Sequence, residues 1–251
     1  MERAEICRHI DEGANFYLRL LGDAKHMEYY SNEYYSVIRP KSGEEGGSSL
    51  FNVRLENLTE DEIEQKVDEI KKINIHTWWG FGLSEKMLDA IWKGQQRPQP
   101  QPEPNEEEAC MALLPEEKPV YDPLKNSITV KRVDNAEDFK LWANISNKVL
   151  HGGYPIMHEE NHYHLCEKGV MACYIGYYEK TPAAVSAVMN NNDISSLEFV
   201  ATLKEYQRKG LAKAVCSKAI DDAFKNGSKI ISLRASPEGK KLYQLLGFKI
   251  Y

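Results

Sequence analysis

A polar loop that ends in a glycine lies in the C-terminal half of the chain, and its residue types suit the binding of an anion. Gly210 stands between an apolar stretch that predicts a strand and an amphipathic stretch that predicts a helix over residues 211–226. The first turn of a helix carries unpaired N–H groups and partial positive charge, and glycine lets a ligand approach the backbone closely. Three cations add full charges: Arg208, Lys209 and Lys213. We predict a pyrophosphate site here, although an ordinary strand–loop–helix junction explains the same residues equally well.

Histidines and glutamates crowd residues 151–164, where they could in principle hold a metal ion. Residues 158–162 read His-Glu-Glu-Asn-His, which matches the zinc-protease pattern H-E-x-x-H by letters. That pattern is short and frequent, and a metalloprotease also needs a third ligand and an open cleft. We therefore predict no metal, and keep a metal-dependent hydrolase using the His158–His164 segment as an alternative. Otherwise these histidines line an acceptor site or lie on the surface: His151, His158, His162 and His164.

The five cysteines give no sign of a disulfide framework or a structural zinc site. Their number is odd, and no C-x-x-C pair occurs. Reduced thiols fit a cytosolic protein. Cys216 falls on the apolar face of the predicted helix 211–226, so we assign it to the core rather than to catalysis.

The elements that must position the glycine loop alternate between strands and helices. Strands are expected at residues 127–133, 170–178, 182–189, 194–203, 229–235 and 248–251. Helices are expected at residues 136–150, 157–168, 211–226 and 238–246. This order predicts an α/β (α+β) fold with a mixed, mostly antiparallel sheet flanked by helices.

The N-terminal half predicts a second, smaller α/β lobe over residues 1–95. Its elements are a helix over 3–21, strands at 34–39, 50–55 and 75–81, and helices at 59–73 and 84–92. Thr59 and Glu62 have the spacing of a capping box. Alternating prolines in residues 95–104 predict an extended connector. We assign residues 96–126 to this linker and a connecting strand near 110–114, and residues 127–251 to the second domain.

Composition and charge narrow the classes of function. The chain has 42% hydrophobic and 28% charged residues, which is ordinary for a globular protein. No apolar run approaches the roughly 20 residues of a membrane span, and the N-terminus lacks a signal-peptide layout, so we predict a cytoplasmic protein without a membrane partner. The net charge of −6 divides into −10 for residues 1–120 and +4 for residues 121–251. The acidic total argues against nucleic acid, and the basic half suits a small anionic ligand.

Two sequence blocks resemble the GNAT superfamily of N-acetyltransferases. The loop fits neither the Walker motif nor the dinucleotide-binding fingerprint. Gln207-x-x-Gly210-x-Ala212 instead matches the family's Arg/Gln-x-x-Gly-x-Gly/Ala loop, between the fourth strand and the next helix. Residues 235–248 resemble its closing block, which ends in Leu-Tyr-x-x-x-Gly-Phe. The resemblance covers about residues 127–251, without the usual seventh strand, so the N-terminal half is expected to cover that sheet edge.

The resemblance implies roles for individual residues. Backbone amides of the loop would hold the pyrophosphate of CoA, and the Gln207 side chain would brace the loop; the amides belong to Arg208, Lys209, Gly210, Leu211, Ala212 and Lys213. The pantetheine arm would pair with the backbone of Phe199, Val200 and Ala201, with the Val200 amide facing the thioester oxygen. Ser236 and Lys240 would reach the far end of the cofactor. Tyr243 would protonate the departing thiolate.

A general base for the acceptor amine is expected on the same strand. Strict alternation of side chains puts Glu198 and Val200 on one face, so Glu198 could accept the amine proton, unless it is a solvent-facing or ion-paired strand residue. We predict acetyl transfer by direct attack, with acetyl-CoA as co-substrate and no metal, in a monomer or homodimer. The acceptor would be a primary amine of a small molecule or peptide. A non-catalytic CoA-binding or regulatory module is the alternative, which Tyr243 disfavours.

The N-terminal lobe is similar in element order to a shortened, degenerate GNAT-like unit. Residues 55–60 stand where its phosphate loop would be. They contain no glycine and carry two carboxylates that would repel a pyrophosphate. We therefore expect no second CoA in this lobe.

Overall fold

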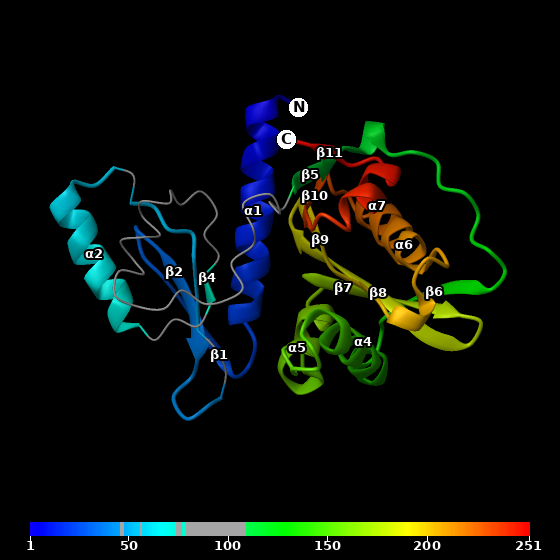
Figure 1. Cartoon of the computed structure of the whole chain (residues 1–251), viewed down its shortest axis with the longest axis horizontal. Helices are drawn as coiled ribbons and strands as arrows, with labels where there is room; N and C mark the ends of the chain where they lie inside the picture. Colours follow the sequence, from blue (N-terminus) through cyan, green and yellow to red (C-terminus); the bar gives the residue numbers. More distant parts are fainter. Residues whose placement is uncertain (46–47, 56, 74–76, 79–108) are drawn as a thin grey trace. The chain divides into compact units, whose positions relative to one another are not determined.

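The computed structural model describes residues 1–45, 48–55, 57–73, 77–78 and 109–251 (Figure 1). Contacts divide the chain into two compact units, the first made of Met1–Tyr17 with Glu106–Tyr251 and the second of Leu18–Asn105. The sequence-based boundaries at 1–95, 96–126 and 127–251 stay a prediction. The expected helix at 84–92 and the proline-rich connector at 95–104 lie outside the described residues.

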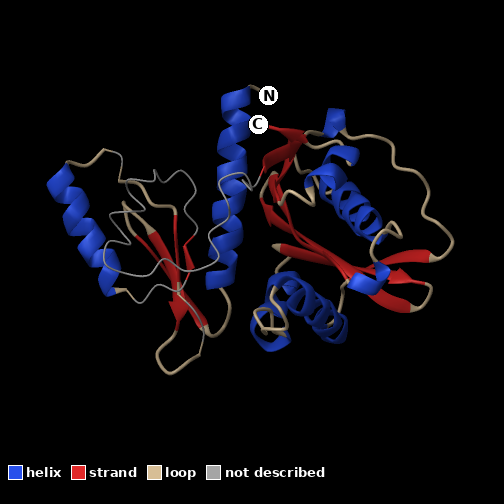
Figure 2. Ribbon diagram, viewed as in Figure 1, coloured by secondary structure: helices blue, strands red, loops and turns tan. Residues whose placement is uncertain are grey.

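Unit 1 is built on a mixed sheet, as the sequence predicts. In the described part of the chain this sheet has seven strands, in the order β11-β5-β10-β9-β8-β7-β6 (Figure 2). Pairing is antiparallel except between β9 and β10. The strands are β5 (Ala109–Leu113), β6 (Ile128–Arg132), β7 (Met171–Tyr178), β8 (Thr181–Asn191), β9 (Ile194–Thr202), β10 (Ile230–Ala235) and β11 (Lys249–Ile250).

Helices cover both faces of this sheet (Figure 1). On one face lie α6 (Leu211–Lys225) and α7 (Lys240–Leu245); on the other lie α4 (Ala136–Leu150), α5 (Glu159–Glu167) and the first part of α1 (Arg3–Gly22). Side chains of β10 alternate between the two layers: Ile231 and Leu233 join the α6 core, whereas Ile230 packs with Ile6 of α1. Short 3-10 turns form at Pro115–Glu117 and Lys204–Tyr206.

Strand β5 lies between β10 and β11, near the sheet edge that the sequence analysis expected the N-terminal half to cover. It pairs with β10 on one side and β11 on the other, so it lies inside the sheet rather than along the outside. Met111, Ala112 and Leu113 are fully buried there. A strand from the segment between the two predicted domains thus completes this part of the sheet.

Helix α1 closes the same end of the sheet. Ile6 and Ile10 pack with Ala112 of β5 and Ile230 of β10. Gly13 sits so close to the sheet that a Cβ there would lie 2.5 Å from Ser232 Oγ. Glycine is needed at this position because of the close approach.

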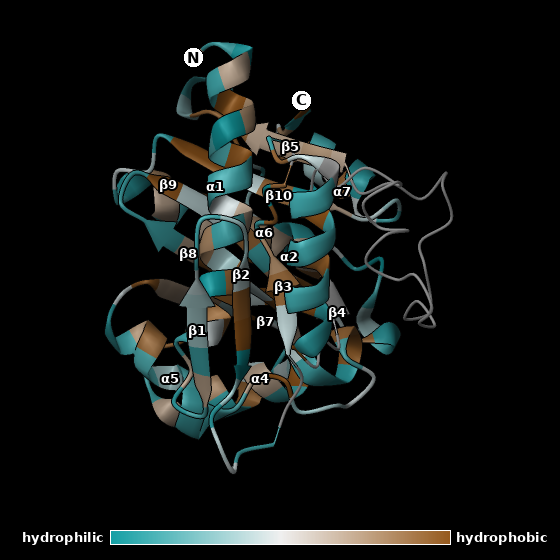
Figure 3. Ribbon diagram, turned by 90° about the vertical axis from the view of Figure 1, so that its left-hand side faces the viewer, coloured by the Kyte–Doolittle hydropathy of each residue, from teal (hydrophilic) through white to brown (hydrophobic). Residues whose placement is uncertain are grey.

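Unit 2 has a four-stranded sheet in the described residues, in the order β1-β2-β3-β4. Its elements are β1 (Met27–Ser31), β2 (Ser36–Pro40), β3 (Ser49–Phe51), β4 (Thr77–Trp78) and α2 (Glu60–Lys72). The capping box between Thr59 and Glu62 is present as predicted, whereas β1 was not expected. Figure 3 shows α2 as largely hydrophilic and β2 as largely hydrophobic, which agrees with the buried cluster of Tyr35, Val37, Leu50 and Ile70.

None of the helices within the described ranges is long and apolar enough to cross a membrane.

Candidate functional site

The two parallel strands at the centre of unit 1 pair over only part of their length. Ile194–Ser196 of β9 pair with Ile230–Ser232 of β10. Beyond Ser196, β9 continues to Thr202 and β10 to Ala235 without further pairing between them. One edge of β9 from residue 197 onward therefore has no strand partner among the described residues. An extended ligand with amide groups could pair with such an edge as an added strand.

A β-bulge lies in this part of β9. Glu198 pairs with Ala187 of β8, but the next register pair is Ala201 with Val185, so β9 holds one residue more than β8. Phe199 in the bulge has a φ of 52°, which is unusual for a residue other than glycine. Bulges re-aim backbone groups and are common beside active sites. The bulge also breaks the side-chain alternation that the sequence argument used to place Glu198 beside Val200, so that argument is wrong at this point.

The glycine loop joins the end of β9 to α6. Two of its residues have left-handed backbone conformations, Arg208 with a φ of 63° and Gly210 with a φ of 97°. Alternation of such residues turns successive N–H groups inward and forms a concavity for an anion. Helix α6 begins directly after Gly210, and no side chain caps its N-terminus. The start of α6 therefore carries no side-chain cap, and the binding of an anion by the loop amides stays a prediction.

Side chains hold the loop in place. Gln207 Nε2 donates to the Thr202 carbonyl over 3.4 Å, which links the loop to the end of β9. The Lys209 ammonium lies 4.5 Å from the ring centre of Tyr178 and 4.9 Å from that of Tyr206. Lys213 forms an ion pair of 3.1 Å with Asp122. Lys209 and Lys213 thus already have partners, whereas Lys204 and Arg208 are exposed cations of the loop.

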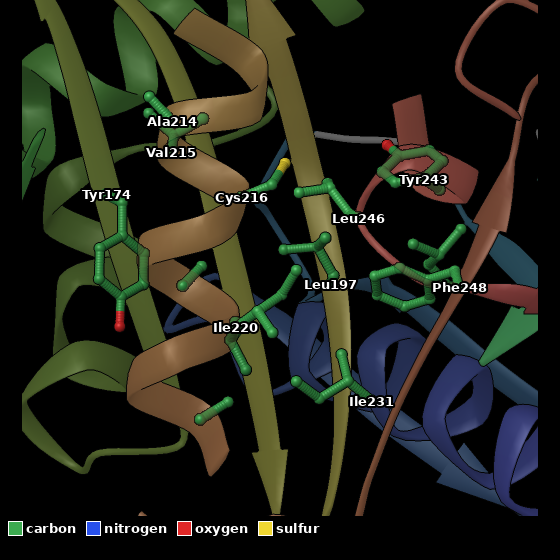
Figure 4. Close-up of a cluster of buried hydrophobic side chains, with 14 of the residues drawn as sticks. Tyr174, Leu197, Ala214, Val215, Cys216, Ile220, Ile231, Tyr243, Leu246 and Phe248 are labelled. Atoms are coloured by element: carbon green, nitrogen blue, oxygen red, sulfur yellow. The ribbon is translucent and has the colours of Figure 1, made fainter. Parts of the chain in front are cut away.

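Tyr243 of α7 lies in the buried cluster that also contains Cys216, Leu246 and Phe248. Its ring is only 9% exposed and contacts Phe248 edge-on at 6.0 Å (Figure 4). Burial, followed by the nearby Cys216 and Glu198, raises the pKa of Tyr243 well above its usual range. Tyr243 is therefore a phenol that stays protonated at neutral pH. The shared roles of Tyr243 and Glu198 in catalysis stay a prediction.

Cys216 packs in the same cluster as Tyr243 and is fully buried. Burial raises the pKa of its thiol far above the ordinary value. A thiol that does not ionise is a poor nucleophile, which agrees with its assignment to the core.

Ser236 lies in the turn before α7, and Lys240 is the first residue of that helix. The Ser236 hydroxyl accepts from Gly239 N over 3.3 Å, and its carbonyl accepts from Lys240 N over 3.0 Å. Ser236 is exposed and Lys240 is partly exposed. Ser236 thus shapes the start of α7, and both side chains remain accessible to a ligand.

The histidine segment does not form a ligand set for a metal. His162 is buried, and its Nδ1 lies 3.1 Å from both the backbone N and the carbonyl O of His158. Over the described ranges, no group of three His, Cys, Asp or Glu residues could hold a metal ion. His151 is partly buried beside Phe199, with ring centres 6.4 Å apart, and burial lowers the pKa of its imidazole.

Aromatic residues around the bulge were not predicted as part of the site. Trp142 of α4 and Tyr17 of α1 contact the Phe199 ring edge-on, with ring centres 5.3 Å and 5.5 Å apart. The sequence placed Trp142 only on the apolar face of a helix. Its helical spacing identifies it as a core residue, but its contact with a bulge 57 positions later depends on the tertiary fold.

The split between β9 and β10, the bulge of β9 and the glycine-led helix α6 lie within a segment that matches a family model. Residues 137–248 match the model of the acetyltransferase (GNAT) family. The C-terminal part of this chain is therefore a GNAT-family domain. Comparison with curated proteins gives no match.

One solved structure agrees with this fold over most of both chains. A GCN5-related N-acetyltransferase from Kribbella flavida superposes with a TM-score of 0.64 at 13% identity, over 95% of this chain and 91% of that one. A predicted acetyltransferase from Clostridium acetobutylicum, solved with acetyl-CoA, gives a TM-score of 0.42 at 17% identity, over 49% and 91%. An aminoglycoside acetyltransferase from an uncultured soil metagenomic sample, solved with sisomicin, gives 0.42 at 12%, over 48% and 85%.

Proposed function

We propose that this protein transfers an acetyl group from acetyl-CoA to a primary amine of a small molecule or peptide, by direct attack of the amine on the thioester. Membership of residues 137–248 in the acetyltransferase family supports the class of reaction. The observation that carries the proposal is the edge of β9 beyond Ser196, which pairs with no strand of the described residues and contains the bulge at Phe199. This edge offers a row of backbone groups next to a loop that suits an anion.

Acetyl-CoA would bind along this edge. Its pyrophosphate would accept hydrogen bonds from the amides of the loop and the first turn of α6, where the helix dipole favours negative charge. The pantetheine arm carries amides, so it would pair with the backbone of Phe199–Ala201 as an added strand. Ser236 and Lys240 would contact the far end of the cofactor.

The reaction needs three groups around the thioester. The Val200 amide would donate to the carbonyl oxygen as negative charge develops on it. Glu198 would accept the proton of the attacking amine, because a neutral amine is the nucleophile. Tyr243, protonated at neutral pH, would donate to the departing thiolate. Attack is direct, so no covalent enzyme intermediate is needed.

We also propose a cytoplasmic location for this activity. The five cysteines are all free thiols, as expected in a reducing compartment.

Acetyl transfer from acetyl-CoA to a panel of amines tests the proposal. The panel should hold amino acids, polyamines, amino sugars and peptides with free N-termini, with thiol release and product mass as readouts. We expect thiol release that depends on at least one amine. Binding of acetyl-CoA by calorimetry without transfer to any amine would instead support the non-catalytic binding module. Absence of acetyl-CoA binding would refute both.

A further inference from the structure

Phe199 is held in a conformation that a phenylalanine seldom adopts. Its φ of 52° lies in the left-handed region, and the residue is 7% exposed within the bulge of β9. Left-handed backbone at a residue other than glycine persists only where the surrounding structure imposes it. The contacts of Phe199 should therefore reveal what imposes it.

Rings from two helices clamp the Phe199 side chain. The Trp142 indole meets it at an interplanar angle of 78° and the Tyr17 ring at 72°, both edge-to-face. Edge-to-face pairs at these separations are favourable and directional. Trp142 is itself completely buried, so it has little freedom to move away from Phe199.

Trp142 also binds the strand opposite the bulge. Its Nε1 donates to the Ser186 carbonyl over 3.0 Å. Ser186 is the β8 residue that the bulge leaves without a register partner on β9. On the other face of the sheet, the Ser186 hydroxyl donates to the Val215 carbonyl of α6 over 3.2 Å. One side chain therefore holds both sides of the bulge.

We propose that Trp142, together with Tyr17, is a positioning residue for acetyl transfer. It holds Phe199 in the left-handed conformation and so aims the neighbouring Val200 amide at the acyl carbonyl oxygen. This inference rests on the proposed function, in which that amide stabilises the developing oxyanion. It makes α1, at the opposite end of the chain from the GNAT motifs, a contributor to the site.

The substitution Trp142→Phe tests whether Trp142 holds Phe199 in the left-handed conformation. It keeps an aromatic ring in the core and removes the N–H that donates to Ser186. We expect kcat for acetyl transfer to fall at least tenfold, while the Kd of acetyl-CoA by calorimetry changes less than threefold. Phe139→Leu is the matched control. Phe139 is equally buried on α4, but its ring contacts are Trp142 and Tyr163 rather than Phe199. Its kcat should stay within threefold; equal losses of kcat in both variants would overturn the proposal.

A second pair of variants separates conformation from packing. Phe199→Gly and Phe199→Ala both remove the ring, but only glycine adopts a positive φ freely. We expect kcat to be about tenfold higher for Phe199→Gly than for Phe199→Ala. Trp142→Phe should also lower kcat by a smaller factor in a protein that already carries Phe199→Gly than in the unchanged protein. Equal kcat for the glycine and alanine variants would show that the contacts of Trp142 and Tyr17 with Phe199 pack the core without setting its backbone conformation.

A structural readout keeps this test independent of turnover. Crystal structures of the unchanged protein and of Trp142→Phe give the φ of Phe199 directly. We expect a positive φ in the first and its loss in the second. A positive φ at Phe199 in the Trp142→Phe variant would show that Trp142 does not impose this conformation. If the unchanged protein transfers no acetyl group, the proposed function fails, while the comparison of φ still decides whether Trp142 holds the bulge.

Discussion

Replacing Gly210 by valine would put a branched side chain at the start of α6, where the amides of the first helical turn meet the proposed pyrophosphate. The backbone there has a φ of 97°, and a Cβ would meet only Ile128 Cδ1, at 3.7 Å. The fold therefore has room for a Cβ atom at this position. Its cost to folding is the left-handed conformation, roughly 1–3 kcal/mol.

Gly227 supplies a control with the same backbone strain. It lies just beyond the other end of α6, with a φ of 98° and nothing within 4 Å of a built Cβ. Gly227→Val should lower the unfolding temperature about as much as Gly210→Val. Only the substitution at Gly210 stands in the path of the phosphate.

The expected loss of affinity follows from the hydrogen bonds at risk. A hydrogen bond to a charged group contributes about 1.5–3 kcal/mol, so losing one weakens binding roughly 10- to 150-fold. Calorimetry with acetyl-CoA measures this loss in both variants. If both are folded and Gly210→Val binds acetyl-CoA within threefold of Gly227→Val, the loop is not the pyrophosphate site.

Four further outcomes are expected. Tyr243→Phe should lower kcat by about 100- to 10,000-fold with little change in acetyl-CoA affinity; a kcat within threefold makes Tyr243 a packing residue. Because its pKa is raised, the acid form persists up to that pKa and is lost only above it, so the pH–rate profile should show no loss from Tyr243 between pH ~6 and ~9. Calorimetry should give one acetyl-CoA per chain, since residues 55–60 lack glycine and carry carboxylates; a value of two contradicts this. Residues 125–251 alone should be poorly soluble, because they lack β5; a soluble, monodisperse fragment would count against a structural need for that strand.

Local signals in the sequence were sufficient for most elements. The helix at Ala136–Leu150 was predicted to the residue, because its apolar residues recur at helical spacing. The capping box of α2 follows from Thr59 and Glu62 alone, since both partners lie within one turn. The glycine loop was found because strand, loop and helix are consecutive in the chain.

Features that depend on pairing between distant segments were not predictable in this way. The bulge at Phe199 follows from the register of β9 against β8, and the residue types of β9 do not predict it. Strand β1 was missed because its residues Met27–Ser31 are mostly polar or exposed. The insertion of β5 between β10 and β11 joins segments more than 100 residues apart.

The segment that carries the acetyltransferase motifs is smaller than the unit that folds around them. The family match begins at residue 137, yet Ile6, Ile10, Met111 and Leu113 are buried in the same unit. Burying each such side chain contributes about 1.5–3 kcal/mol, so these four contribute roughly 6–12 kcal/mol. That sum is comparable to the whole stability of a typical domain, about 5–15 kcal/mol. The chain therefore needs residues before and after the segment 18–105 to complete one core, and Tyr17 then brings the first helix to the bulge where acetyl transfer is proposed.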